Sequence, residues 1–148
     1  MPREYPENPL VGVGAIIVED GRVLLIRRGQ PPQMGQWSLP GGVVECGETL
    51  RDAVIREARE ETGLAIEARD MLGVYERIVH GESAPASAGG SRVRYHYVLI
   101  DFLCRPVGGG LAAGSDAADV RWFSPEELEG LNLAADTLEV IRRGLATA

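Results

Sequence analysis

Apolar segments divide the chain into short strands interrupted by helical segments. Residues 10–18 are almost entirely apolar and are followed by the turn sequence Glu19-Asp20-Gly21 and a second apolar run at 23–26. Two β-branched runs around such a turn predict a β-hairpin. Further strands are predicted at residues 71–79, 93–104 and 120–123, with loops rich in small residues at 83–90 and 106–115.

Helical signals occur at three places. Residues 49–62 carry the strongest, because Thr49 is a suitable N-cap, Asp52 follows it by three residues and Gly63 is a stop signal. Ser124-Pro125 marks another helix start, and the last helix is expected at residues 134–143. No internal repeat or long linker divides the chain. We therefore expect one mixed α/β unit of the α+β class, covering residues 1–148.

The composition is that of an ordinary globular domain. The 148 residues are 45% hydrophobic and carry a net charge of −7, and all 15 basic residues are arginine. No basic run is longer than two residues, so we do not expect electrostatic binding to nucleic acid. Cys46 and Cys104 are too few for a disulfide framework, and no signal peptide or membrane-spanning run is recognisable. The cytoplasm is therefore the expected location, with neither nucleic acid nor membrane as a partner.

The helix at residues 49–62 carries acidic side chains on the face that should be buried. Its apolar residues form one stripe on a helical wheel, and Glu57 and Glu61 fall in the middle of that stripe, with Glu60 on its edge. Stacked carboxylates repel each other, so burial requires that one keeps its proton or that a divalent cation lies between them. Oxygen ligands without His or Cys favour Mg²⁺, with Mn²⁺ as the second option.

A plain alternative is a solvated acidic helix end. Ion pairs between Asp52 and Arg56 and between Arg56 and Glu60 would stabilise such a helix. This interpretation accounts for Arg56 but not for the two glutamates in the apolar stripe. The metal hypothesis accounts for both.

The same residues resemble the signature of the Nudix hydrolases. Gly42, then Glu48 after five residues, then Arg56-Glu57-Ala58-Arg59-Glu60-Glu61-Thr62-Gly63-Leu64 after seven more, meets each fixed position of that signature. The segments 37–42 and 120–128 agree with it, and the pattern is most similar to small bacterial MutT-like or ADP-ribose pyrophosphatase-like members. The resemblance implies a mixed β-sheet sandwiched between helices, with the signature forming a loop-helix-loop.

The resemblance also implies roles for individual residues. Glu57 and Glu61 would be the principal Mg²⁺ ligands, Glu60 a further ligand, and the carbonyl of Gly41 an additional oxygen. Arg56 would orient a glutamate of the signature, and Glu48 would pair with it. A later loop often adds one more acid as ligand or base, for which Asp116 is preferred over Asp119 and Glu82.

The activity that the resemblance implies is hydrolysis of the pyrophosphate bond in a nucleoside diphosphate linked to another group, with ADP-ribose or another nucleotide sugar as the first choice. The alternatives are a pyrophosphohydrolase for noncanonical or oxidised nucleoside triphosphates and a nucleotide-sensing module without catalysis. Homodimers occur among relatives, so a homodimer stays open.

Candidate substrate contacts are Trp37, Arg27, Arg94 and His96. Strand alternation places Tyr95 and Tyr97 on one face of 93–99 and Arg94 and His96 on the other. We expect the tyrosine face in the core and the other face at the surface or in the pocket.

Overall fold

The computed structural model describes residues 3–30, 33–83, 91–114 and 117–148. The predicted hairpin is present, formed by β1 (Leu10–Glu19) and β2 (Arg22–Arg28). Val18 pairs with Val23, and the turn residues Asp20 and Gly21 both have positive φ, at 52° and 73°. Positive φ at both central positions is the geometry of the tight hairpin turn that the sequence indicates.

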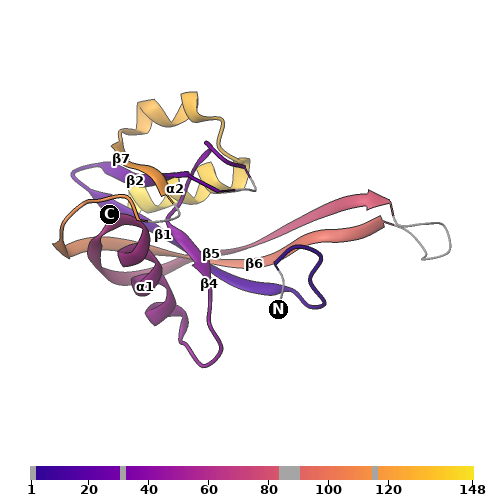
Figure 1. Cartoon of the computed structure of the whole chain (residues 1–148). Helices are drawn as coiled ribbons and strands as arrows, with labels where there is room; N and C mark the ends of the chain where they lie inside the picture. Colours follow the sequence, from indigo (N-terminus) through magenta and orange to yellow (C-terminus); the bar gives the residue numbers. More distant parts are fainter. Residues whose placement is uncertain (1–2, 31–32, 84–90, 115–116) are drawn as a thin grey trace.

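The strands form one mixed sheet in which β1 has a central place. β4 (Gly41–Val43) pairs with β1 antiparallel, and β6 (Ser91–Gly109) pairs with β1 parallel. β5 (Leu64–Ser83) pairs with β6 antiparallel, and Figure 1 shows this pair extending as an arm away from the rest of the molecule. β3 (Trp37–Ser38) and β7 (Ala117–Phe123) both pair with β2.

Two strands exceed their predicted lengths by the most residues. β5 and β6 exceed the expected ranges 71–79 and 93–104 at both ends, and part of the expected loop 106–115 belongs to β6. The β5–β6 ladder continues through several register shifts, which interrupt the alternation of apolar and polar residues without ending the pairing. The sequence pattern therefore underestimates the arm.

Helices cover both faces of the sheet. Helix α1 (Leu50–Thr62) is capped by Thr49, whose hydroxyl accepts the Asp52 N–H at 3.1 Å, and it ends at Gly63, which has a φ of 78°. α1 packs with Val13, Ala15 and Ile17 of β1. The 3₁₀ helix η2 (Pro125–Leu131) and helix α2 (Ala135–Thr147) cover the opposite face. The mixed sheet therefore lies between helices, which confirms the predicted α+β sandwich.

The last helix extends to Thr147, four residues beyond the predicted end. Among the helices of the described residues, none combines the length and apolar character that crossing a membrane requires.

Candidate active site

The C-terminal half of α1 turns two carboxylates toward the sheet and one toward solvent. Glu61 is 9% exposed, and the side chain of Glu57 is 14% exposed, whereas that of Glu60 is 58% exposed. This is the distribution that the helical wheel predicts. The predicted acidic stripe is therefore buried at Glu61 and half-buried at Glu57, and it reaches solvent at Glu60.

Glu61 and Glu57 are seated against the two glycines of β4. The Gly41 N–H donates to Glu61 Oε1 at 3.0 Å. A Cβ on Gly42 would lie 2.5 Å from the carboxyl carbon of Glu57, so that carboxyl group occupies space that only glycine leaves free. The spacing of the sequence signature therefore places each inner carboxylate on one backbone position of β4.

The surroundings of Glu61, including the charge of Glu57, alter its protonation. Burial raises the pKa of Glu61 from its ordinary 4.5 to about 8; the Gly41 N–H opposes this shift, and the charge of Glu57 and a hydrogen bond with it add to it. In the metal-free protein near pH 7, Glu61 therefore retains a proton. A cation bound between the two groups would remove the need for that proton.

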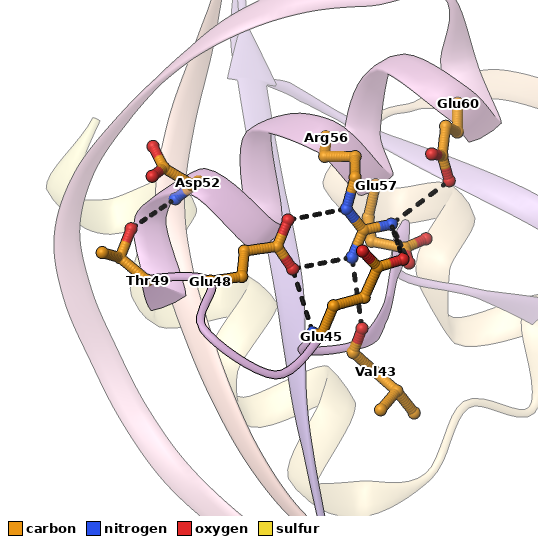
Figure 2. Close-up of polar contacts among 8 residues, drawn as sticks. All are labelled: Val43, Glu45, Glu48, Thr49, Asp52, Arg56, Glu57 and Glu60. Atoms are coloured by element: carbon orange, nitrogen blue, oxygen red, sulfur yellow. Dashed lines mark hydrogen bonds and ion pairs between the residues drawn. The ribbon is translucent and has the colours of Figure 1, made fainter.

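Arg56 connects the loop before α1 to the helix itself, as Figure 2 shows. Its guanidinium donates two hydrogen bonds to Glu48, from Nε at 2.7 Å and from Nη2 at 2.9 Å. Nη1 donates to Glu57 Oε1 at 2.9 Å and reaches Glu60 at 3.4 Å. Nη2 also donates to the Val43 carbonyl. One side chain thus fixes both the loop and an inner carboxylate.

The charge on Glu48 is strongly stabilised. The hydrogen bonds from Arg56, followed by the Glu45 N–H, lower the pKa of Glu48 to about 2. The ion pair between Arg56 and Glu60 that the sequence indicates is present. In the part of the chain that the structure describes, Asp52 makes no such pair with Arg56, and Figure 2 shows its backbone N–H bound to Thr49 instead.

The donor set fits a hard divalent cation in part. Within the described residues, no three His, Cys, Asp or Glu side chains converge on one point. Glu61, which is buried, and Glu57, which is half-buried, nevertheless supply two neighbouring carboxyl groups. A cation would relieve their repulsion when both are ionised, and carboxylate oxygen is the donor that Mg²⁺ prefers. Glu60 reaches the same end of α1 from the solvent side.

A pocket of about 480 Å³ begins at the glycines of β4 and continues along the face of the sheet that α2 covers. Gly41, Gly42 and Val43 form one part of its wall, and Trp37, Tyr75 and Tyr97 form another. The rings of Tyr95 and Tyr97 are stacked with centroids 6.4 Å apart. Glu57 and Glu61 are not themselves among the lining residues; they contact Gly41 and Gly42, which form part of the pocket wall.

The predicted substrate contacts divide into two groups. Trp37 and Arg94 line the pocket, and Arg94 also pairs with Glu4 at 2.9 Å. Arg27 and His96 are not among the described residues of the pocket wall. The Arg27 guanidinium lies 5.9 Å from the Trp37 ring centroid, and the neighbouring Arg28 lines the pocket in its place.

The face assignment within β6 is corrected. Tyr95 and Tyr97 line the pocket and are only half-buried, so the prediction that they lie in the core is wrong. His96 points to the other face because adjacent residues of a strand alternate. The predicted alternation fails at Arg94, which lines the pocket together with Tyr95 and Tyr97, because the β5–β6 ladder shifts register between the Val79–Tyr95 and His80–Val93 pairs.

The additional acid is not located. Asp116 and the side chain of Glu82 lie outside the described residues. Asp119 lies on β7, where its carboxylate accepts a hydrogen bond of 2.8 Å from the backbone N–H of Val120. The Gly114 N–H donates to the Glu61 carbonyl at 3.0 Å, so the chain is attached to the end of α1 shortly before position 116.

Several polar residues of the pocket were not predicted from the sequence, among them the charged residues Asp101, Arg77 and Asp136. Arg77 pairs with Asp136 at 3.0 Å. One signal was available for Asp101, since it is the only charged residue in the otherwise apolar run 98–104.

Comparisons with known proteins agree with the sequence signature and the fold. The NUDIX domain family model matches residues 8–144. An ADP-ribose pyrophosphatase of Methanocaldococcus jannaschii is 39% identical over 91% of this chain and 72% of its own length. A CTP pyrophosphohydrolase of Escherichia coli is 41% identical over 90% of each chain. The crystal structure of a MutT NUDIX hydrolase from Burkholderia pseudomallei superposes with a TM-score of 0.74 at 33% identity, over 92% of this chain and 98% of that one.

Proposed function

Because this chain belongs to the Nudix family of hydrolases, we propose that it is a Mg²⁺-dependent pyrophosphohydrolase. In this proposal it hydrolyses the pyrophosphate bond of a nucleoside diphosphate linked to a further group, and the substrate is ADP-ribose or another nucleotide sugar. The observation that carries the proposal is the pair Glu57 and Glu61, whose carboxyl groups contact Gly41 and Gly42, two residues of the pocket wall. We further propose that residues 1–148 act as one catalytic domain.

Glu57 and Glu61 would hold the metal, with Glu60 and the carbonyl of Gly41 as further donors. When bound, Mg²⁺ polarises a phosphoryl oxygen and neutralises charge on the diphosphate. Substrate and protein are both anionic, the protein at −7, so a cation at this place also removes a repulsion that would oppose binding. Mn²⁺ satisfies the same oxygen donors.

Arg56 and Glu48 act as positioning residues in this proposal. The two-point contact between them fixes the guanidinium, and Nη1 then holds Glu57 in its orientation. Asp116 is proposed as the later-loop acid that assists the attacking water, because Gly114 is bound to the end of α1 that carries Glu60 and Glu61.

Trp37 and Arg94 are the proposed substrate contacts of the pocket wall. A nucleoside triphosphate is the second candidate substrate class, and the similarity to a CTP pyrophosphohydrolase over nearly the whole chain favours it specifically. The third hypothesis, a sensing module, has less support because the signature keeps its glutamates. Small nucleotides are the substrates in both enzyme proposals.

A product-resolved screen separates these proposals. ADP-ribose should yield AMP and ribose 5-phosphate, whereas a triphosphate should yield a nucleoside monophosphate and pyrophosphate, each in Mg²⁺ and in Mn²⁺. Glu61→Gln should lower turnover by about 100-fold or more, while Glu67→Gln, an exposed glutamate paired with Arg105, should not change it. Near-normal turnover of Glu61→Gln would refute the metal assignment, and stoichiometric binding without product would favour the sensor.

A further inference from the structure

Asp101 on β6 is a buried acid to which the proposed chemistry gives no role. It is 7% exposed and lines the pocket. Its cross-strand partners are Gly14 on β1 and Gly73 on β5. Because neither neighbour has a side chain, the Asp101 carboxyl group lies in a slot between two strands. A Cβ on Gly14 would collide with Asp101 Oδ1, so the slot requires glycine there.

The carboxyl group of Asp101 has no hydrogen-bond or ion-pair partner among the described residues. Each fully buried side-chain nitrogen or oxygen among the described residues has a hydrogen-bond partner. Because the Asp101 oxygens have no such partner, they must retain a small exposure. The pocket that Asp101 lines gives them access to a ligand. A buried carboxylate without a partner is unfavourable. A ligand that donates a hydrogen bond there would gain more than it would in water.

The nearest opposite charge is already engaged. Arg77 donates to Asp136 at 3.0 Å and approaches Thr137 at 3.4 Å. Burial, followed by the charge of Asp136, raises the pKa of Asp101 to about 6 against the opposing charge of Arg77. Asp101 is therefore mostly ionised at neutral pH, and an ionised carboxylate only accepts hydrogen bonds.

The walls around Asp101 suit a flat aromatic ligand. Trp37, Tyr75 and Tyr97 line the same pocket. Gly73 is the strand partner of Asp101 on β5. The Tyr75 hydroxyl lies 2.9 Å from the position that a Cβ on Gly73 would take, so the Tyr75 ring lies over Gly73. Stacking rings beside a hydrogen-bond acceptor are the combination that recognises a nucleobase edge.

We propose that Asp101 selects nucleotides whose base carries an exocyclic amino group, by accepting a hydrogen bond from that group in the pocket. Adenine and cytosine each present an amino donor, whereas hypoxanthine and uracil present a carbonyl oxygen at the same position. A carbonyl facing the carboxylate would leave two acceptors opposed in a buried slot. The inference rests on the proposed function, because it assigns the pocket to the base of the nucleotide.

Two substrate pairs that differ only in this group test the inference. For ADP-ribose against its hypoxanthine analogue, and for CTP against UTP, kcat/KM should favour the amino member by about 10- to 100-fold. In Asp101→Asn the side-chain amide can donate to a carbonyl, so the preference should fall to about threefold or less, or invert. Asp70→Asn, an acid outside this pocket, should keep the wild-type ratio.

Binding measurements keep this test separate from that of hydrolysis. AMP against IMP, and CMP against UMP, are titrated by calorimetry into metal-free protein, where no turnover is required. If no substrate is hydrolysed while AMP still binds more tightly than IMP, the proposed activity fails and the base selection stands. Equal affinities and equal kcat/KM values within each pair for the wild type overturn the inference, even if Asp101→Asn folds poorly. A folded Asp101→Asn that keeps the wild-type preference overturns it as well.

Discussion

Replacing Glu61 with Gln should make the metal-free protein more stable at pH 8 while removing its activity. Glu61 has a pKa of about 8 in the folded protein against 4.5 as its ordinary value. Between these two pH values the folded state binds one proton more than the unfolded state, so the free energy of unfolding falls as the pH rises. Gln carries no titrating proton and can still accept the Gly41 N–H. The variant therefore lacks this decline.

The magnitude follows from the pKa shift. Each pH unit between 4.5 and 8 lowers the free energy of unfolding by up to about 1.4 kcal/mol, or about 5 kcal/mol over the whole interval. A domain of this size has a total stability of about 5–15 kcal/mol, so the effect is a large share of it. Mg²⁺ at 100 times its dissociation constant would raise the free energy of unfolding of the wild type by about 2.7 kcal/mol. It would raise that of the variant by much less, because the variant lacks one of the proposed ligands.

Urea unfolding in EDTA from pH 5 to 8 measures this difference. The difference in unfolding free energy between Glu61→Gln and the wild type should move in favour of the variant by several kcal/mol across this range. Glu67→Gln, an exposed glutamate, should show no such trend. A difference that stays constant with pH would refute the reasoning, because it would mean that Glu61 titrates alike in both states.

Two further predictions concern the residues around the carboxylates. Arg56→Lys loses the two-point contact with Glu48 and the simultaneous hydrogen bond to Glu57, so the Mg²⁺ concentration for half-maximal activity should rise about 10- to 100-fold. The control Arg105→Lys should leave this concentration unchanged. Equal Mg²⁺ profiles for Arg56→Lys and the wild type would contradict the prediction. Gly42→Ala should lower kcat by about 100-fold with little change in melting temperature, because its Cβ meets the Glu57 carboxyl group. Gly41→Ala should instead impair folding, because its Cβ meets the Val13 backbone; the reverse order of effects on folding would show that this geometry is wrong.

The carboxylate site could be predicted because its parts are close in sequence. Thr49 and Gly63 define the ends of α1, and helical periodicity alone places Glu57 and Glu61 inward and Glu60 at the edge. The contact between Arg56 and Glu48 spans eight residues and belongs to one loop and helix. A contiguous pattern therefore contains most of the information for this part of the site.

The pocket could not be predicted in the same way, because strand register decides its lining. Sequence alternation places Arg27 and Arg28 on opposite faces of β2 but does not show which face lines the pocket. The ladder between β2 and β7 also shifts register between these two residues. Such a bulge re-aims a side chain without a clear sequence signal. The same argument applies to Tyr97, which lines the pocket, and to its neighbour His96, which is not among the lining residues. The sequence alternation separates these two side chains without showing which of them faces the pocket.

Asp101 shows how a local inconsistency could have been used. An acid within the run 98–104 conflicts with the burial that its neighbours predict, and such conflicts concentrate at functional sites. The glycines that accommodate it, Gly14 and Gly73, are 87 and 28 residues distant in sequence and meet it only through the ladders of β1 and β5 with β6. From the sequence, each of these glycines is equally consistent with an ordinary turn or bulge. Only the strand register brings Asp101, Gly14 and Gly73 together. Asp101 can therefore be recognised as a candidate ligand contact only once the pairing of the sheet is known.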